Sequence, residues 1–386
     1  MFIEEIKEVF IVAKKRANGE GSIRQRKDGR WEGLYSINNK RKSVYGKTQE
    51  EVRKKLNKVL NDIDSGIYIE DCRITMGEWL YTWLYDYKKN TVKQKTFEGY
   101  EALVNKHLIP AFSKIQLKKL SVDNVQRFIN QKISEGLSSR TIRYINTLLH
   151  SALKQAINNG LIVRNVAEAV TLPERKQKDR KFLTAEEQER FIKCLSDEKS
   201  GFVLLFALST GLRRGELLAL RWSNYDNQKK YITVTESLSR LKGADGKSHL
   251  TFTTPKTASS KRTIPLLPDI ANKLNVHRQQ QAVNRLKAGQ MWEDNDLIFC
   301  TDFGKPLEPR NLFRILGRVC DKAEIAHINI HALRHAFATR ALENGIPLKV
   351  VSDMLGHSSI ALTADIYSHV SVETMENELQ KLSNAF

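Results

Sequence analysis

Six side chains in the second half of the chain are of the types needed to cleave a phosphodiester. They are Arg213, Lys256, His331, Arg334, His357 and Tyr367. A phosphodiester carries one negative charge and gains more in its pentacovalent transition state, so two planar guanidiniums can grip its non-bridging oxygens. Tyrosine, with a free pKa of about 10, is a poor nucleophile unless a cationic pocket or a base assists it. Together these residues predict a site that holds a phosphodiester and attacks it with a tyrosine.

Arg213 is expected near the start of a helix. Gly211 interrupts one apolar run, and another run with helical spacing begins at Glu216. Backbone N–H groups and the helix dipole favour an anion at such a position.

Lys256 lies in a polar turn between two strand-like stretches, 250–253 and 262–264, which predicts a hairpin with this lysine at its mobile tip. Lys261 is in the same turn and is the alternative lysine. The Pro-Lys-Thr step around Lys256 favours Lys256.

The remaining candidates follow a helix start and a helix stop. His331 and Arg334 are one turn apart where a helix is expected to begin, so both can face the same way. Gly356 is typical of a helix C-terminal stop, and His357 comes directly after it. Tyr367 follows His357 at an interval of ten positions.

Each of these residues also has an ordinary interpretation. A lone arginine in a helix is usually a solvated surface charge. His331 and His335, four positions apart, could bind zinc from one helix face, but the glutamate of a metalloprotease motif is absent between them. Only the ordered set of six makes the catalytic interpretation specific, and no metal site or glycine-rich phosphate loop is expected.

In this order and spacing, the six residues resemble the catalytic domain of tyrosine recombinases, the phage-type integrases. The resemblance implies that His331 is the general base, that Lys256 protonates the departing 5′ oxygen and that His357 hydrogen-bonds the phosphate. It also implies a covalent 3′-phosphotyrosine intermediate, which would need neither a metal nor a nucleotide cofactor for rejoining.

The composition is consistent with a nucleic-acid partner. The chain of 386 residues has 63 Lys and Arg against 44 Asp and Glu, a net charge of +19. Such an excess favours salt-dependent attraction to polyphosphate.

The length predicts two or three domains. The absence of a signal peptide and of a membrane span predicts a cytoplasmic protein, and four widely separated cysteines predict reduced thiols: Cys72, Cys194, Cys300 and Cys320. The resemblance implies a bacterial, nucleoid-associated protein.

The first segment, 1–72, is expected to hold a small three-stranded antiparallel sheet followed by a helix. Asp28-Gly29 and Asn38-Asn39 separate short alternating stretches, and Thr48 opens a capping-box pattern with Glu51. The segment resembles the arm-DNA-binding domain of conjugative-transposon integrases. A solubilising basic sheet is the alternative. The candidate DNA contacts are Arg24, Arg26, Lys27, Arg30, Lys40, Arg41 and Lys42.

The second segment, 73–172, is expected to be a helical bundle. Apolar residues recur at helical intervals in 76–87, 96–109, 121–134 and 138–159, with Pro110 and Gly136 as breaks. The segment resembles the core-binding domain of the same family, although an ordinary bundle with a charged outer face would have the same pattern. Arg140 and Arg143, on the early turns of the last helix, are candidate contacts to DNA.

The prediction is therefore a multidomain α+β protein. Residues 173–181 are a charged linker, and 182–386 form a mainly helical catalytic domain with a small antiparallel sheet and a helical C-terminal tail from 370 that packs in cis or docks on a neighbour. The resemblance implies a site-specific recombinase that integrates and excises a conjugative transposon or prophage as a homotetramer on double-stranded DNA with core and arm sites. A DNA-bending protein and a small excision factor are the implied partners. A type IB topoisomerase and a non-catalytic DNA-binding regulator are the alternatives.

Overall fold

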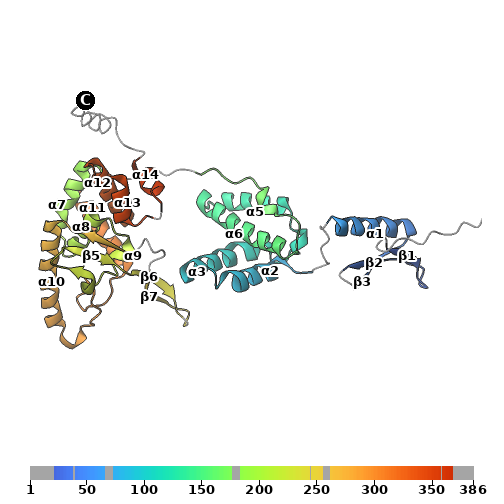
Figure 1. Cartoon of the computed structure of the whole chain (residues 1–386), viewed down its shortest axis with the longest axis horizontal. Helices are drawn as coiled ribbons and strands as arrows, with labels where there is room; N and C mark the ends of the chain where they lie inside the picture. The colour runs from blue at the N-terminus through green and yellow to red at the C-terminus, as the bar shows by residue number, and fades with distance from the viewer. Residues whose placement is uncertain are drawn as a thin grey trace, which may run out of the picture. The chain divides into compact units, whose positions relative to one another are not determined.

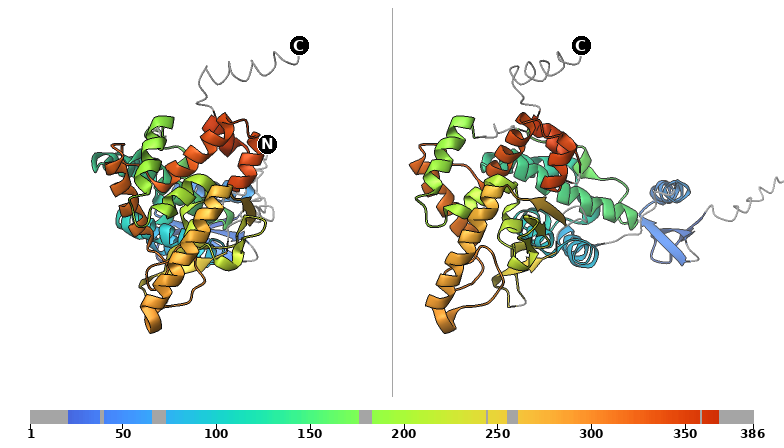
Figure 2. Two further views of the ribbon diagram at one scale, coloured as in Figure 1. Left: turned by 90° about the vertical axis from the view of Figure 1, so that its left-hand side faces the viewer. Right: turned by 60° about the vertical axis from the view of Figure 1, so that its left-hand side comes forward.

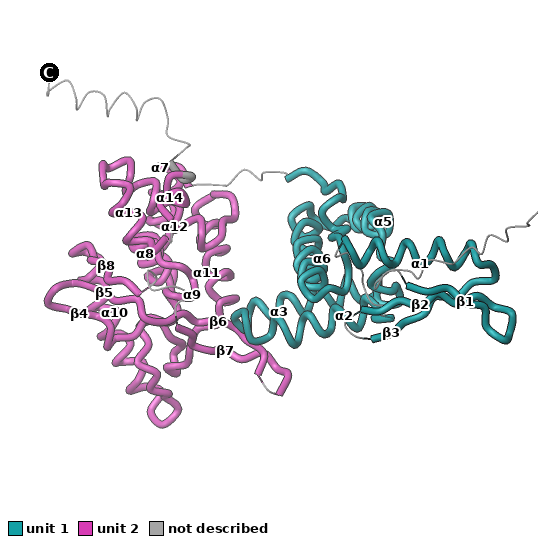
Figure 3. The backbone as a smooth tube through the Cα atoms, turned by 45° about the vertical axis from the view of Figure 1, so that its right-hand side comes forward, with its two compact units in different colours: residues 1–176 teal, residues 177–386 magenta. Residues whose placement is uncertain are grey.

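The computed structural model describes residues 21–37, 40–65, 73–175, 183–243, 245–254, 261–357 and 359–367, with side chains omitted for 365–367. The chain divides into two compact units, residues 1–176 and 177–386 (Figures 1 and 3). The expected C-terminal tail from 370 lies outside the described residues.

The first unit begins with the three-stranded antiparallel sheet that the sequence predicts. The strands are β1 (Ser22–Gln25), β2 (Trp31–Ile37) and β3 (Lys40–Gly46), in the order β1-β2-β3. Helix α1 (Gln49–Asp64) begins after Thr48, whose hydroxyl accepts a hydrogen bond from the Glu51 amide. Gly33 allows α1 to pack closely on the sheet, because a Cβ atom added there would lie 2.9 Å from both Val44 and Val52.

A helical bundle completes the first unit, as expected. Its helical segments are α2 (Met76–Thr82), η1 (Trp83–Lys88), α3 (Gln94–Leu103), η2 (Val104–Leu108), α4 (Ile109–Phe112), η3 (Leu117–Lys119), α5 (Val122–Ser134), α6 (Ser139–Asn158) and η4 (Val166–Glu168). Side chains of Thr75, Ser121 and Ser138 cap α2, α5 and α6. The core of the bundle includes Trp79, whose indole N–H donates to the carbonyl oxygen of Ala152 at 2.9 Å.

The sequence predicts that a helix ends at Pro110, and this prediction is wrong. The π-helix η2 runs directly into α4, and Pro110 is in the first turn of α4. A proline is tolerated there because its missing N–H would have no partner within the new helix. Gly136 is a break, with φ of +78° directly after the end of α5.

The second unit is mainly helical and contains a small sheet. Its helices are α7 (Ala185–Leu195), α8 (Gly201–Thr210), α9 (Arg214–Leu217), η5 (Trp222–Asn224), α10 (Pro268–Ala288), η7 (Gly289–Met291), α11 (Pro309–Lys322), α12 (Ile330–Glu343), α13 (Leu348–Leu355) and α14 (Ala361–Tyr367). Helix α8 is apolar all round, as a buried helix must be, and α7, α10 and α12 pack against it. The long helix α10 runs along one side of this unit (Figures 1 and 2).

The strands of the second unit contradict the hairpin predicted around Lys256. Strand β8 (Arg262–Pro265) pairs with β5 (Tyr231–Val234), which also pairs with β4 (Tyr225–Asp226). Strand β7 (Ser248–Thr253) pairs instead with β6 (Ser237–Lys242). The segment between β7 and β8 therefore links two sheets, because the turn at Gly243 and Gly246 already closes a hairpin onto β7. In the described part of the chain, no helix has the length and apolarity to cross a membrane.

Candidate active site

Arg334 is a buried cation on α12. The side chain of Asn329 caps this helix by accepting a hydrogen bond from the Ala332 amide, and Arg334 follows one turn later with only 4% of its surface exposed. Its Nη1 and Nη2 atoms donate hydrogen bonds of 2.8 Å to the carbonyl oxygens of Gly211 and Leu355. The guanidinium therefore joins the end of α8 to the end of α13.

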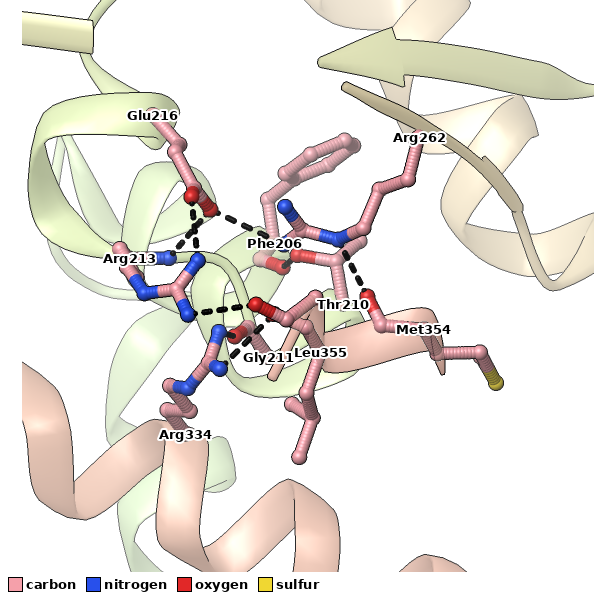
Figure 4. A network of polar contacts seen from close by, with 10 residues as sticks. Phe206, Thr210, Gly211, Arg213, Glu216, Arg262, Arg334, Met354 and Leu355 are labelled. Carbon is pink, nitrogen blue, oxygen red and sulfur yellow. Dashed lines mark hydrogen bonds and ion pairs between the residues drawn. The ribbon is translucent and has the colours of Figure 1, made fainter. Parts of the chain in front are cut away.

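Arg213 reaches the same helix end from another element. It is the N-cap residue of α9, and its Nη2 donates to the carbonyl oxygen of Gly356 at 2.7 Å. Its Nη1 donates to Oε1 of Glu216 at 2.8 Å (Figure 4). Arg213 and Arg334 are thus held by the consecutive carbonyls of Gly356 and Leu355, and the structure brings these two predicted residues together.

Helix α9 is shorter than the sequence pattern indicates. It has a single turn of four residues, so its dipole contributes little to anion binding beside Arg213. The local positive charge comes from side chains.

The two guanidiniums differ in their partners among the described residues, because Arg213 pairs with the carboxylate of Glu216 whereas Arg334 donates to backbone carbonyls. Burial, and then the charge of Arg213, lowers the pKa of Arg334 to about 9. Its two hydrogen-bond acceptors among the described residues are neutral carbonyl oxygens. A guanidinium has five N–H donors, so each arginine has capacity beyond its two described side-chain hydrogen bonds. A negatively charged ligand would offset the cost of burying these cations.

Glu216 and Arg262 complete the network, and neither is among the six residues predicted from the sequence. Glu216 is buried, and its Oε2 accepts a hydrogen bond of 2.9 Å from Nη2 of Arg262. Burial alone would raise the pKa of the Glu216 carboxyl, but hydrogen bonds and charge from Arg262 and Arg213 hold it below its ordinary value. The spacing of three between Arg213 and Glu216, at a helix start, was the available sequence signal.

His331 and His357 lie in the field of these cations. Partial loss of hydration, and then the charges of Arg334 and Arg213, lowers the pKa of His331, which keeps an exposed part of its surface. The same causes lower the pKa of His357 to about 4. His357 follows Gly356, which ends α13 in the left-handed conformation as predicted, and its Nδ1 lies 2.7 Å from the Thr363 hydroxyl. Both imidazoles are therefore neutral near pH 7 without a ligand.

Two of the six predicted residues are not positioned at the level of side chains. Lys256 lies outside the described residues, whereas its alternative Lys261 is described and exposed. Tyr367 is the last residue of α14, and only its backbone is described. Helix α14 packs against α12 and α13, the helices associated with Arg334 and His357.

The predicted DNA contacts of the sheet divide between its two faces. Arg24, Glu32 and Tyr45 form one cross-strand row, and alternation places Arg41 on the same face, opposite α1. Lys40 and Lys42 alternate onto the face of Val44, which packs against α1. The remaining candidates, Arg26, Lys27 and Arg30, are exposed at the β1–β2 turn.

Several of these cations already have partners. Arg24 donates to Glu32 at 2.8 Å, and the side chain of Arg30 donates two hydrogen bonds to Asp28. In the bundle, Nε of Arg143 donates to the carbonyl oxygen of Pro173 at 2.8 Å, whereas Arg140 is exposed.

Comparison with known proteins identifies the class. Residues 181–374 match the phage integrase family, and residues 75–133 match the N-terminal SAM-like domain of phage integrases. The chain is 30% identical to a tyrosine recombinase XerC-like protein of Caldanaerobacter subterraneus, covering 90% of this chain and 92% of that protein. It is also 30% identical to an integrase of Streptomyces ambofaciens, covering 92% and 94%. The chain therefore belongs to the phage integrase family and is a tyrosine-type site-specific recombinase.

Solved structures share the fold. The Tn1549 transposon integrase, solved with a circular intermediate DNA, superposes with a TM-score of 0.68 at 21% identity over 80% of this chain and 99% of that one. A lambda integrase dimer bound to a core site has a TM-score of 0.57 at 18% identity over 92% and 96%. These similarities agree with the predicted multidomain α+β fold.

Proposed function

We propose that the chain integrates and excises a mobile element by cleaving DNA with Tyr367 while Arg213 and Arg334 hold the scissile phosphate. The observation that carries the proposal is the pair of arginines fixed on consecutive carbonyls at the end of α13, with donor capacity remaining and, within the described parts of the chain, only neutral carbonyl partners for Arg334. Two guanidiniums can bind both non-bridging oxygens of a phosphodiester and stabilise the charge that grows there.

The histidines would then act on the nucleophile and the phosphate. A neutral His331 can accept the phenolic proton, and a neutral His357 can donate a hydrogen bond to a phosphate oxygen. The lowered pKa values of both imidazoles support these assignments. The covalent 3′-phosphotyrosine keeps the energy of the broken bond, so the rejoining step would need no metal or nucleotide.

Lys256 is assigned as the acid that protonates the departing 5′ oxygen. A duplex in which sulfur replaces this bridging oxygen separates Lys256 from Lys261, because a thiolate leaves without a proton donor. Lys256→Ala should cleave the ordinary duplex slowly and the sulfur duplex at close to the wild-type rate. Lys261→Ala should cleave both duplexes normally, and the opposite pattern would reassign the acid.

The proposed assembly is a homotetramer on two duplexes. Residues 73–172 would bind the core site together with the catalytic domain, and residues 1–72 would bind arm sites. A DNA-bending protein and a small excision factor would direct the reaction. The tail from 370 would pack in cis or dock on a neighbour. The solution mass of the complex on two-site DNA is compared for the full chain and for a truncation after Val370. The same number of subunits in both complexes would contradict docking in trans.

The proposed activity is tested by incubating two duplexes, one with the joined ends of the element and one with its target, without metal or nucleotide. Recombinant duplexes joined at fixed positions are expected. Relaxation of any supercoiled plasmid, without joining of one duplex to the other, would instead indicate a topoisomerase. Binding of DNA without cleavage would indicate a regulator.

A further inference from the structure

Arg262 is a buried arginine outside the six residues of the predicted site. It opens strand β8, and only 7% of its side chain is exposed. Its Nε donates to the carbonyl oxygen of Met354 at 2.6 Å, and its Nη2 donates to Oε2 of Glu216 at 2.9 Å. One side chain thus ties β8 to both α9 and α13.

Three arginines converge on the end of α13 (Figure 4). The consecutive carbonyl oxygens of Met354, Leu355 and Gly356 accept hydrogen bonds from Arg262, Arg334 and Arg213, respectively. The last carbonyls of a helix have no partner within it and carry the negative end of its dipole. Because the three acceptors belong to one short backbone segment, their spacing fixes the spacing of the guanidiniums.

The close packing of Arg262 leaves little space for a side chain at the helix end. A Cβ atom added at Gly356 would lie 2.9 Å from Nη1 of Arg262 and 3.1 Å from its Cδ. The guanidinium of Arg262 therefore packs beside the residue whose carbonyl orients Arg213.

Arg262 also changes the net charge around the two arginines of the predicted site. Among the described residues, the three guanidiniums and the carboxylate of Glu216 sum to a net charge of +2. A phosphodiester carries one negative charge and approaches two in its pentacovalent state. Without Arg262, Arg213 would be the remaining described ion-pair partner of Glu216, and the net charge of these groups would fall to +1. Arg262 therefore leaves the charge of Arg213 available for the phosphate.

We propose that Arg262 is a positioning residue for strand cleavage, which occupies the second oxygen of Glu216 and braces the end of α13 so that Arg213 and Arg334 face the scissile phosphate. Its burial means that it acts through these groups and does not contact DNA. The inference rests on the proposed cleavage reaction.

The test compares Arg262→Met, Arg262→Lys and Arg221→Met. Arg221 is a matched control in the same unit, because its guanidinium also binds one carboxylate, Glu236, and one backbone carbonyl, that of Asn295, both at 2.8 Å. Covalent complex formation is timed on a nicked duplex with an ordinary scissile phosphate, and on one with an uncharged methylphosphonate at that position. DNA affinity and the melting temperature are measured in parallel.

Arg262→Met should retain DNA affinity and lose about tenfold or more in cleavage rate on the ordinary duplex. On the methylphosphonate, the ratio of wild-type to variant rates should shrink, because there is less charge to balance. Arg262→Lys should be intermediate, since one ammonium cannot reproduce the two-armed contact. Arg221→Met should lower the melting temperature without changing the cleavage rate.

Equal losses on both duplexes, or equal cleavage losses in the Arg221 and Arg262 variants, would make Arg262 merely structural and overturn the inference. If Arg262→Met does not fold, Arg262→Lys takes its place. Its ratio of wild-type to variant cleavage rates is then compared between the ordinary and the methylphosphonate duplex. A wild-type protein that forms no covalent complex on the ordinary duplex would overturn the proposed function and this inference together.

Discussion

The Nη2 atom of Arg213 donates a hydrogen bond of 2.7 Å to the carbonyl oxygen of Gly356, 143 positions further along the chain. Gly356 has φ of +64°, and His357 follows it. The backbone turn that delivers His357 therefore also orients the guanidinium of Arg213.

The first prediction concerns this turn. Gly356→Ala should destabilise the protein by about 1–3 kcal/mol, because alanine is strained at positive φ and its Cβ would contact Arg262. The cleavage rate should fall further than the remaining folded fraction explains. Gly136→Ala, at φ of +78° with open space around it, is a control for backbone strain alone. Denaturant unfolding and single-turnover cleavage measure both effects, and equal cleavage in the two variants would contradict the coupling.

The second prediction concerns the guanidiniums. Arg334→Lys should lower the cleavage rate by about 10² to 10³, because an ammonium cannot hold two carbonyls and grip a phosphate bidentately. DNA affinity should change little, since it is spread over many phosphate contacts. Single-turnover rates and binding isotherms on one duplex test the difference. A loss of affinity as large as the loss of rate would argue against a transition-state role.

The third prediction concerns pH. The pKa of His357 is about 4 in the fold, below its ordinary value of 6.5, so between these values the unfolded chain binds more protons than the folded one. The stability contribution of the neutral His357 is fully present above pH 6.5 and is lost as the pH falls towards 4. His357→Asn should flatten this part of the melting-temperature profile. An unchanged profile in the variant would mean that His357 is not the titrating group.

The fourth prediction concerns the N-terminal sheet. Arg41→Ala, on the face opposite α1, should weaken arm-site binding by about 1–3 kcal/mol if the arginine reads a base, or reduce the salt slope by about one if it contacts a phosphate. Lys40→Ala removes the same charge from the adjacent position on the other face and should have a smaller effect. Titrations at several salt concentrations distinguish the two variants. Equal losses of arm-site binding in the two variants would exclude DNA recognition by a single face of the sheet.

Much of the fold follows from local patterns in the sequence. Alternation and turn residues predict β1 to β3, and helical periodicity predicts the bundle. Strand pairing is harder to predict from the sequence, because alternation within β7 and β8 does not identify the strand with which each one pairs. Pro110 is not the break that the apolar pattern predicts, because the π-helical turn before it has no signature in that pattern.

The site divides in the same way. The helix cap at Gly356 and the helix start before Arg334 are local and are predicted by residue type. The partners of Arg213 and Arg262 on α13 are not, because they depend on contacts across 143 and 92 positions. Sequence alone therefore predicts which side chains carry the chemistry more readily than what holds them in place.

The most direct test of the central claim uses radiolabelled nicked duplexes made from the element's own ends. They are incubated with wild-type and Tyr367→Phe protein without metal or nucleotide and run on a denaturing gel. We expect a covalent protein–DNA band with the wild type only, together with retained DNA binding by Tyr367→Phe. A covalent band that persists in Tyr367→Phe would contradict the assignment of the nucleophile.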